Sequence, residues 1–418
     1  MSDDSKFAVC VVLGSIAQLI GPIAAASSDD RSFFNAWNKC CCFLDSMSSA
    51  IFVGTILALP GLYLVMVRQS YYELGYTMYQ LGSTMAVQPY CGVVPKLVSP
   101  DYEGRGSGIM VVYTSLGSIV GCVLGILIGS DVISTRMCGW IVIVSNFLGA
   151  LFVIWSLLPF QSILRNSKEQ KVRTLRAEVR SFVSTFGRES LFRTLFLVWG
   201  LVSVAQYVPL LMVENDLQRN AWDSTYQIFS HVLTHSKETS TSICTLISLI
   251  LSFLSAAYTG YLLDMNERLT NRIVLWGTCI GVLSLVSYGI ADLVSSFELV
   301  LLASSCSGIA QGIAGTALWS KTVSTLRSNE DSHYNSLGGS DNDDDKEEEE
   351  NEKKTDNFSR DMSIFWLATL LPQILIPPLR SLLFFLFDSH ETAAFATTWF
   401  VSAGLVAVSI IPVVLYIY

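Results

Sequence analysis

About eleven long apolar segments fill the chain between residues 7 and 418, and short polar stretches separate them. A helix needs about 20 apolar residues to cross a hydrocarbon core of ~30 Å. No water is available there, so the backbone polar groups must be satisfied within each helix. Only 15% of the residues are charged and 51% are hydrophobic, whereas soluble domains are about 25% charged. The sequence therefore predicts an all-α integral membrane protein in a lipid bilayer.

The distribution of Lys and Arg predicts the orientation of the chain. We expect the spans at 7–26, 43–67, 73–95, 107–130, 138–160, 192–213, 240–263, 273–292, 297–320, 362–387 and 392–416. The loops on one side then hold twenty of the 26 Lys and Arg residues, the loops on the other side hold five, and Arg380 lies within a span. Positive charge marks the cytoplasmic side. We therefore expect a multi-pass protein with its N-terminus outside or in the lumen and its C-terminus in the cytoplasm.

Two charged loops predict the domain organisation. The loop at 161–193 carries eight basic residues and separates an N-terminal bundle of about five spans (1–160) from a C-terminal bundle of about six (194–418). Between Glu330 and Lys354 there are eleven acidic residues and three lysines. So charged a stretch cannot form a packed core, and we expect the cytoplasmic loop 326–360 to be disordered. No basic patch points to a nucleic-acid partner.

A short motif recurs in the two halves of the chain. Residues 21–31 read GPIAAASSDDR and residues 256–268 read AAYTGYLLDMNER, each at the cytoplasmic end of an expected span. Each has a small residue four positions before an Asp, and a basic residue follows within a few positions. The Asp can cap the N-terminus of a neighbouring helix or pair with a basic residue, and thereby latch a gate. The gating positions are Ala25, Asp29, Arg31, Gly260, Asp264 and Arg268.

These motifs resemble the G-x-x-x-D-R/K signature of the major facilitator superfamily, and three longer stretches agree. Residues 93–125 (VVPKLVSPDYEGRGSGIMVVYTSLGSIVGCVLG) resemble the junction of the fourth and fifth helices of sugar-type facilitators. Residues 308–326 and 361–379 resemble the tenth and eleventh helices of the sugar/glycoside and sucrose transporter branches. The resemblance implies a two-bundle fold and a transporter of a small polar solute, with a sugar as the first candidate, that works by alternating access and is expected to be a monomer.

One departure from the family pattern leaves a second function open. If residues 21–31 follow the family's second helix, the first helix is absent, which leaves five plus six spans and agrees with the charge count. The alternative is a truncated or non-transporting facilitator-like protein, such as a receptor, a regulatory protein or an incomplete gene product. No catalytic motif such as HExxH or GxSxG is present, so we do not expect an enzyme, and we expect no cofactor and no metal site.

Polar side chains within the spans are the candidate solute-binding residues, because such groups face a cavity or a partner in a membrane. The set is Tyr76, Tyr79, Gln80, Trp199, Ser203, Gln206, Tyr207, Gln311, Gln373 and Arg380. The tyrosines can instead form an interfacial belt, the amides can bond between helices, and Arg380 can extend to the outer surface.

Two other groups have predicted roles. Gly117, Gly121, Gly125 and Gly129 recur every four residues, and we expect them to pack the fifth family helix within the N-terminal bundle. Proton coupling needs a carboxylate within the membrane, and the candidates are Asp45, Glu73, Glu214 and Asp292, all near the ends of spans. A passive facilitator is as compatible with this pattern as a symporter.

Overall fold

The structure is a computed structural model of the 418-residue chain. It describes residues 46–68, 71–160, 190–219, 237–294, 296–337, 368–387 and 391–417, and in addition Leu13, Gly14, Ala17, Gln18 and Phe365. All the regular elements in these ranges are helices. The α-helices are α3 (Ser46–Leu62), α4 (Tyr72–Leu97), α5 (Glu103–Gly129), α6 (Thr135–Leu157), α9 (Ser190–Arg219), α10 (Lys237–Met265), α11 (Thr270–Val294), α12 (Phe297–Leu337), α14 (Leu371–Phe387), α15 (Glu391–Val408) and α16 (Ile410–Pro412). The short elements between and after them are η2 (Tyr63–Arg68), η3 (Pro100–Tyr102), η4 (Leu158–Phe160), η6 (Glu267–Leu269) and η7 (Val413–Ile417).

The helices confirm the prediction of an all-α membrane protein. Within the described part of the chain, eight helical stretches are long and apolar enough to cross a membrane. The expected span at 73–95 is the helix α4, which is less apolar because it carries tyrosines, amides and Glu73. The last part of the expected span at 362–387 is the shorter apolar helix α14. Of the expected span 7–26, only four residues are described.

The described residues form two compact units. Unit 1 draws on Met1–Leu97, Thr135–Phe192 and Val323–Leu367, and unit 2 on Val98–Ser134, Arg193–Thr322 and Ala368–Tyr418. The bundles at 1–160 and 194–418 that the sequence suggests remain a prediction. In these units, however, α5 groups with helices from the second half of the chain.

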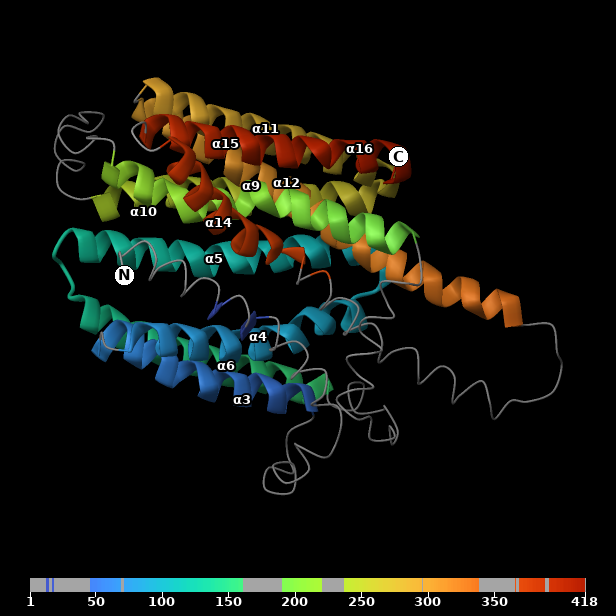
Figure 1. The fold of residues 1–418 in the computed structure, drawn as a ribbon. Coiled ribbons are helices and arrows are strands. Elements are labelled where there is room, and N and C mark those ends of the chain that lie inside the picture. Colours follow the sequence, from blue (N-terminus) through green and yellow to red (C-terminus); the bar gives the residue numbers. More distant parts are fainter. Residues whose placement is uncertain are drawn as a thin grey trace. The chain divides into compact units, whose positions relative to one another are not determined.

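Unit 1 contains α3, α4 and α6, and glycines determine how closely α3 and α4 pack (Figure 1). A Cβ on Gly54 would lie 2.6 Å from the carbonyl oxygen of Gly82, and one on Gly61 would lie 2.5 Å from that of Gly75. The residue numbers run in opposite directions, so the two helices are antiparallel. The two backbones are in contact because both helices have glycine at these positions. Such close packing favours association of helices in lipid, where there is no hydrophobic driving force.

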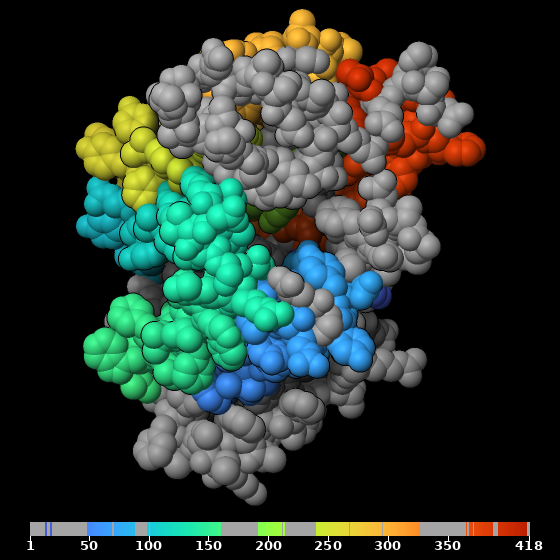
Figure 2. Space-filling view, turned by 90° about the vertical axis from the view of Figure 1, so that its left-hand side faces the viewer, coloured from blue at the N-terminus to red at the C-terminus, as the bar shows by residue number. Residues whose placement is uncertain are grey.

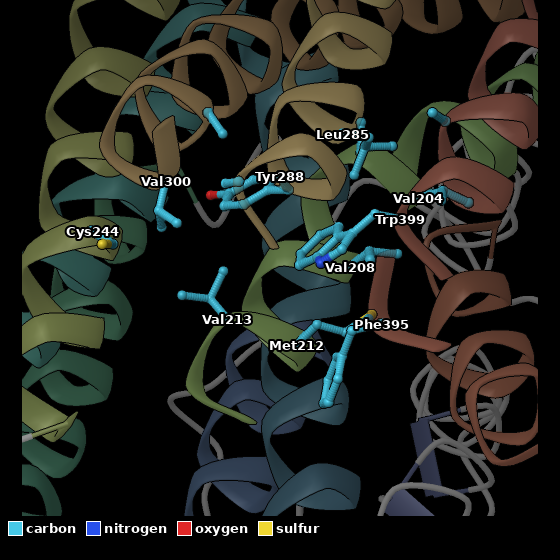
Figure 3. Close-up of a cluster of buried hydrophobic side chains, with 14 of the residues drawn as sticks. Val204, Val208, Met212, Val213, Cys244, Leu285, Tyr288, Val300, Phe395 and Trp399 are labelled. Atoms are coloured by element: carbon cyan, nitrogen blue, oxygen red, sulfur yellow. The ribbon is translucent and has the colours of Figure 1, made fainter. Parts of the chain in front are cut away.

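Unit 2 contains α5, α9, α10, α11, α14, α15 and α12 as far as Thr322. In Figure 1, α5 lies along α10, and α11 lies along α15. Aromatic rings form the centre of its core: Tyr288 of α11 stacks on Trp399 of α15 with ring centroids 4.5 Å apart. Val208 and Met212 of α9 are fully buried in the same cluster (Figure 3).

Large apolar side chains also cover outward-facing helix surfaces. Phe152 and Trp155 of α6 are 64% and 67% exposed, and the helix lies at the surface in Figure 2. A soluble monomer rarely exposes contiguous apolar patches of this kind. Because the helices are long enough to span a bilayer, lipid is the solvent to which these side chains are suited.

Candidate transport site

A hydrogen-bonded ion pair joins the end of α10 to the start of α5 in unit 2. The carboxylate of Asp264 accepts the backbone N–H of Arg105, with donor–acceptor distances of 3.1 and 3.2 Å to its two oxygens. The Nε of Arg105 also lies 3.0 Å from Oδ2 of Asp264. Arg105 is in the first turn of α5, where backbone N–H groups have no partner within the helix and the helix dipole favours an anion. Asp264 therefore caps α5 from outside and pairs with its arginine.

Aromatic rings hold the guanidinium of Arg105 beside Asp264. Its central carbon is 5.5 Å from the ring centroid of Tyr102 and 5.6 Å from that of Tyr261. The Arg105 side chain is 49% exposed, whereas that of Asp264 is only 6% exposed. The carboxylate is thus the buried member of the pair, and the backbone N–H bond is the part of this contact that water screens least.

Glycine makes this contact possible. A Cβ on Gly104 would lie 2.6 Å from Oδ1 of Asp264 and 2.7 Å from the carbonyl oxygen of Gly260. A Cβ on Gly108 would lie 3.0 Å from the carbonyl oxygen of Ala256. Further along the same helix pair, the hydroxyls of Ser115 and Ser252 lie 3.4 Å apart. We call this line of small and hydroxyl residues between α5 and α10 the glycine seam.

The structure describes only some of the other predicted gating positions. Ala25, Asp29 and Arg31 lie outside the described residues. Arg268 is exposed, and its backbone N–H donates to the side-chain oxygen of Asn266. The basic partner of Asp264 in the structure is therefore Arg105, from the 93–125 stretch, and not the arginine of its own motif.

Among the candidate residues of α9, Trp199 is hydrogen-bonded to a neighbouring helix and Ser203 to its own helix. The indole N–H of Trp199 donates to the hydroxyl of Thr322 on α12 at 3.0 Å, and its ring meets that of Trp319 edge-on, with centroids 6.1 Å apart. Ser203 is buried and donates to the carbonyl of Trp199 at 2.6 Å. The contacts of Trp199 join α9 to α12 and place the two indole rings edge to face.

The next turn of α9 carries the candidate residues Gln206 and Tyr207. The amide nitrogen of Gln206 is 3.7 Å from the point where a Cβ on Gly315 would lie, and Val111 of α5 is 3.8 Å from that point. Tyr207 is hydrogen-bonded to Thr369, which precedes α14. Gln206 and Tyr207 are half-buried. Residues of α5 and α9 thus lie close to Gly315 of α12, and one of them presents the side-chain amide of Gln206.

The remaining candidates of unit 2 lie on α12 and α14. Gln311 is one turn before Gly315 on α12, and both Gln311 and Gln373 are half-buried. Arg380 is half-buried too, and its guanidinium carbon lies 5.4 Å and 5.2 Å from the ring centroids of Phe384 and Phe395. Helix α14 continues through Pro377 and Pro378.

In unit 1, the tyrosine and glutamine face of α4 contacts the first described residues of the chain. The side-chain nitrogen of Gln18 donates to the side-chain oxygen of Gln80 at 2.5 Å. A Cβ on Gly14 would lie 2.5 Å from the ring of Tyr76, and that ring is parallel to Tyr72 with centroids 6.2 Å apart. Tyr79 is half-buried, and its backbone packs on Gly61.

Helix α5 contacts α10 at Gly104 and Gly108, which are not among the four predicted packing glycines, and at Gly125, which is one of them. That the four predicted glycines pack this helix within the N-terminal bundle stays a prediction. Among the described residues, no atom lies within 4 Å of a Cβ added at Gly117 or Gly121, and at Gly125 the nearest is the hydroxyl oxygen of Ser242 on α10, at 2.7 Å. A Cβ at Gly104 or Gly108 would also meet α10 closely. Gly129 is half-buried at the end of α5. The spacing of Gly104, Gly108, Ala256 and Gly260, four residues apart on each helix, is a sequence signal that could have identified the glycine seam.

Comparison with known proteins identifies the family. Residues 47–340, well over half of the chain, match the family model of the Major Facilitator Superfamily. No curated protein matches the sequence.

Three solved structures with this fold cover most of the chain. The human organic anion transporter MFSD10 (TETRAN) is 13% identical, with a TM-score of 0.56 over 97% of this chain and 83% of that chain. A bacterial homologue of the iron transporter ferroportin is 14% identical, with a TM-score of 0.59 over 97% and 88%. The transporter FucP is 14% identical, with a TM-score of 0.55 over 98% and 89%. These similarities concern the fold, and together with the family match they show that this multi-pass membrane protein belongs to the Major Facilitator Superfamily, a family of membrane transporters.

Proposed function

We propose that the chain moves a small polar solute, with a sugar as the first candidate, across its membrane by alternating access, either as a facilitator or as a symporter. The family match and the contacts of Asp264 carry this proposal. In such a cycle, two bundles of helices rock around a site near the middle of the membrane. The proposal also retains the two bundles at 1–160 and 194–418 and a monomeric transporter.

The role that we assign to Asp264 is that of a conformational latch. Its carboxylate accepts a backbone N–H at the start of α5 and binds the guanidinium of Arg105. Charge-assisted bonds of this kind contribute about 1.5–3 kcal/mol each. If they form in only one conformation, they shift the equilibrium toward it by roughly tenfold for every 1.4 kcal/mol.

The solute-binding role falls to the polar face of α9 and its surroundings. Gln206 and Tyr207 supply amide and hydroxyl groups, and Trp199 supplies an aromatic ring. Hydroxyl-rich ligands are bound by such a combination of ring faces and donor–acceptor groups. Gln311 is the nearest candidate on α12, one turn from Gly315, and the glutamine and tyrosine side chains of α4 are the corresponding candidates in unit 1. Arg380 offers a cation to an anionic or hydroxyl-rich solute.

The test is uptake by the full-length chain reconstituted in liposomes. Labelled glucose and sucrose are compared with a labelled organic anion and with ferrous iron, since the proteins of similar fold include an organic anion transporter and a homologue of an iron transporter. We expect saturable sugar uptake that unlabelled sugar competes away. Variants at Gln206 and Tyr207 should raise the half-saturating concentration, whereas Gly117→Ala, at an exposed position of α5, should leave it unchanged.

Each outcome of this screen decides one part of the proposal. Saturable uptake of the anion or of iron alone would overturn the sugar assignment and retain the transporter. Uptake of none of the four probes by a folded, correctly inserted chain would favour a facilitator-like protein that does not transport.

A further inference from the structure

One of the four candidate proton-coupling carboxylates is buried in unit 2. Asp292 lies on α11 and is only 2% exposed, although it is two residues from the end of the helix. One turn earlier, Tyr288 is buried against Trp399 and shares a hydrogen bond of 2.8 Å with Ser304. Asp292 therefore extends the aromatic core of unit 2 with a carboxyl group (Figure 3 shows Tyr288 and Trp399).

The carboxyl group of Asp292 is only partly satisfied. The indole of Trp399 is hydrogen-bonded to it, and Trp399 is itself fully buried. The other oxygen, Oδ2, is buried and has no hydrogen-bond partner in the described part of the structure. Among the described residues, an ionised carboxylate in this setting would keep its charge with one donor and no counter-ion at hydrogen-bonding distance. Burying a charge in this way costs several kcal/mol.

The position of Asp292 at the end of its helix also disfavours the charged form of its side chain. The C-terminal end of a helix carries a partial negative charge, and the free carbonyls there disfavour an anion. Asp292 lies within the last turn of α11, which ends at Val294. Binding a proton removes the charge and turns Oδ2 into a hydroxyl donor, so the neutral acid is the form that suits this site.

Among the described residues, no titratable or charged group of the helices packed around α11 forms a salt bridge with Asp292. Cys244 of α10 is buried. Glu298 of α12 is exposed and accepts a bond from Ser296, and Arg380 of α14 lies over Phe384 and Phe395. The side chains of Glu214 and Asp216 on α9, of Lys237 and Glu238 on α10, and of Glu391 on α15 lie outside the described residues.

We propose that Asp292 is a proton-binding site of this transporter, protonated in the conformation described here and released to water in another step of the cycle. The only bond that forms or breaks is the O–H bond at the carboxyl, and the proton comes from and returns to the aqueous phase. The coupling to transport rests on the proposed function, whereas the protonation itself does not.

The first arm of the test measures protonation without any solute. Infrared difference spectra of the reconstituted full-length chain, taken from about pH 5 to about pH 9, should contain the carbonyl stretch of a protonated carboxyl group at neutral pH. Asp292→Asn should remove this band, and Asp131→Asn, at an exposed aspartate, should leave it. Trp399→Phe keeps Asp292 but removes its donor, so the band should remain and change in frequency.

The second arm measures coupling through uptake of labelled glucose and sucrose against a pH gradient and, separately, against a sodium gradient. If one proton accompanies each sugar, one pH unit drives about tenfold accumulation. Asp292→Asn should lose this accumulation and retain exchange of labelled for unlabelled sugar.

The two arms of the test distinguish failure of the proton site from failure of the coupling and from failure of the sugar assignment. A band that persists unchanged in Asp292→Asn, or that is absent from the parent chain, overturns the proton site whatever the chain transports. Sugar accumulation that follows sodium and ignores pH, with Asp292→Asn as active as the parent, overturns the coupling and leaves transport intact. If neither sugar enters, the sugar assignment fails and the infrared arm alone decides whether Asp292 binds a proton.

Discussion

At the scale of single residues, the charged side chains of unit 2 differ in the groups that they contact. Asp264 is nearly buried because two kinds of donor, a backbone N–H and a guanidinium, share its two oxygens. The guanidinium of Arg380 packs on the aromatic rings of Phe384 and Phe395. A cation–π contact contributes about 0.5–2 kcal/mol, depending on desolvation.

Asp264→Asn should slow transport more than it weakens binding of the solute. The amide keeps one acceptor but loses the charge that pairs with Arg105, at a cost of about 1.4 kcal/mol to the latched conformation, or tenfold in its population. In liposome uptake we expect about a tenfold lower maximal rate and a nearly unchanged half-saturating concentration. Arg268→Ala, at the exposed arginine of the same motif, is the control and should transport normally. A normal rate with weakened binding in Asp264→Asn would contradict the latch.

Arg380→Ala should abolish uptake while membrane insertion stays normal. The change removes a cation within a span and its contacts with Phe384 and Phe395, and polar groups at such positions usually face a solute or a partner. Arg136→Ala, at an exposed position in the first turn of α6, should leave uptake unchanged. Uptake at the parent rate by Arg380→Ala would mean that the arginine only reaches toward the outer surface.

At the scale of helices, backbone contact through glycine recurs in both units. In unit 1, Gly54 and Gly61 of α3 meet Gly82 and Gly75 of α4, and in unit 2 Gly104 of α5 meets Gly260 of α10. Helices in lipid gain no hydrophobic free energy from association, so close van der Waals packing must hold them together. The cost of adding a methyl group therefore depends on whether the glycine faces a helix or lipid.

Gly104→Ala and Gly117→Ala form a matched pair on one helix. The first Cβ would lie 2.6 Å from Oδ1 of Asp264, and the second meets no described atom within 4 Å. We expect Gly104→Ala to destabilise the purified protein by about 1–3 kcal/mol through overpacking. Gly117→Ala should be neutral or stabilising by up to about 1 kcal/mol, because Ala favours a helix more than Gly does. Thermal unfolding in detergent measures both, and equal melting temperatures would show that the glycine seam tolerates a methyl group.

At the scale of the whole molecule, the asymmetry of positive charge predicts the orientation in the membrane. Twenty of the 26 Lys and Arg residues lie in loops on one side, and that side is expected to be cytoplasmic. An epitope tag at the N-terminus should bind antibody on intact cells, and a tag after Tyr418 only after permeabilisation, if the chain is in the plasma membrane. Asn357 of the Asn357-Phe358-Ser359 sequon should stay without glycan. The opposite pattern would reverse the orientation.

The sequence by itself determined the membrane class, the all-α architecture, most helix positions and the family, because apolar length and local motifs are properties of contiguous residues. It also identified Asp264 as a residue that could cap a helix or pair with a basic group. Only the tertiary structure decided that Asp264 does both with Arg105, 159 residues away in the chain. Likewise, Gly117 and Gly121 have the packing spacing, but only the structure shows which side of α5 meets α10. Asp292 looks in the sequence like an acid at the end of a span, and its burial under Trp399 arises because α11 and α15 pack side by side. Contacts between residues distant in the chain depend on how helices are paired, and no local pattern records that pairing.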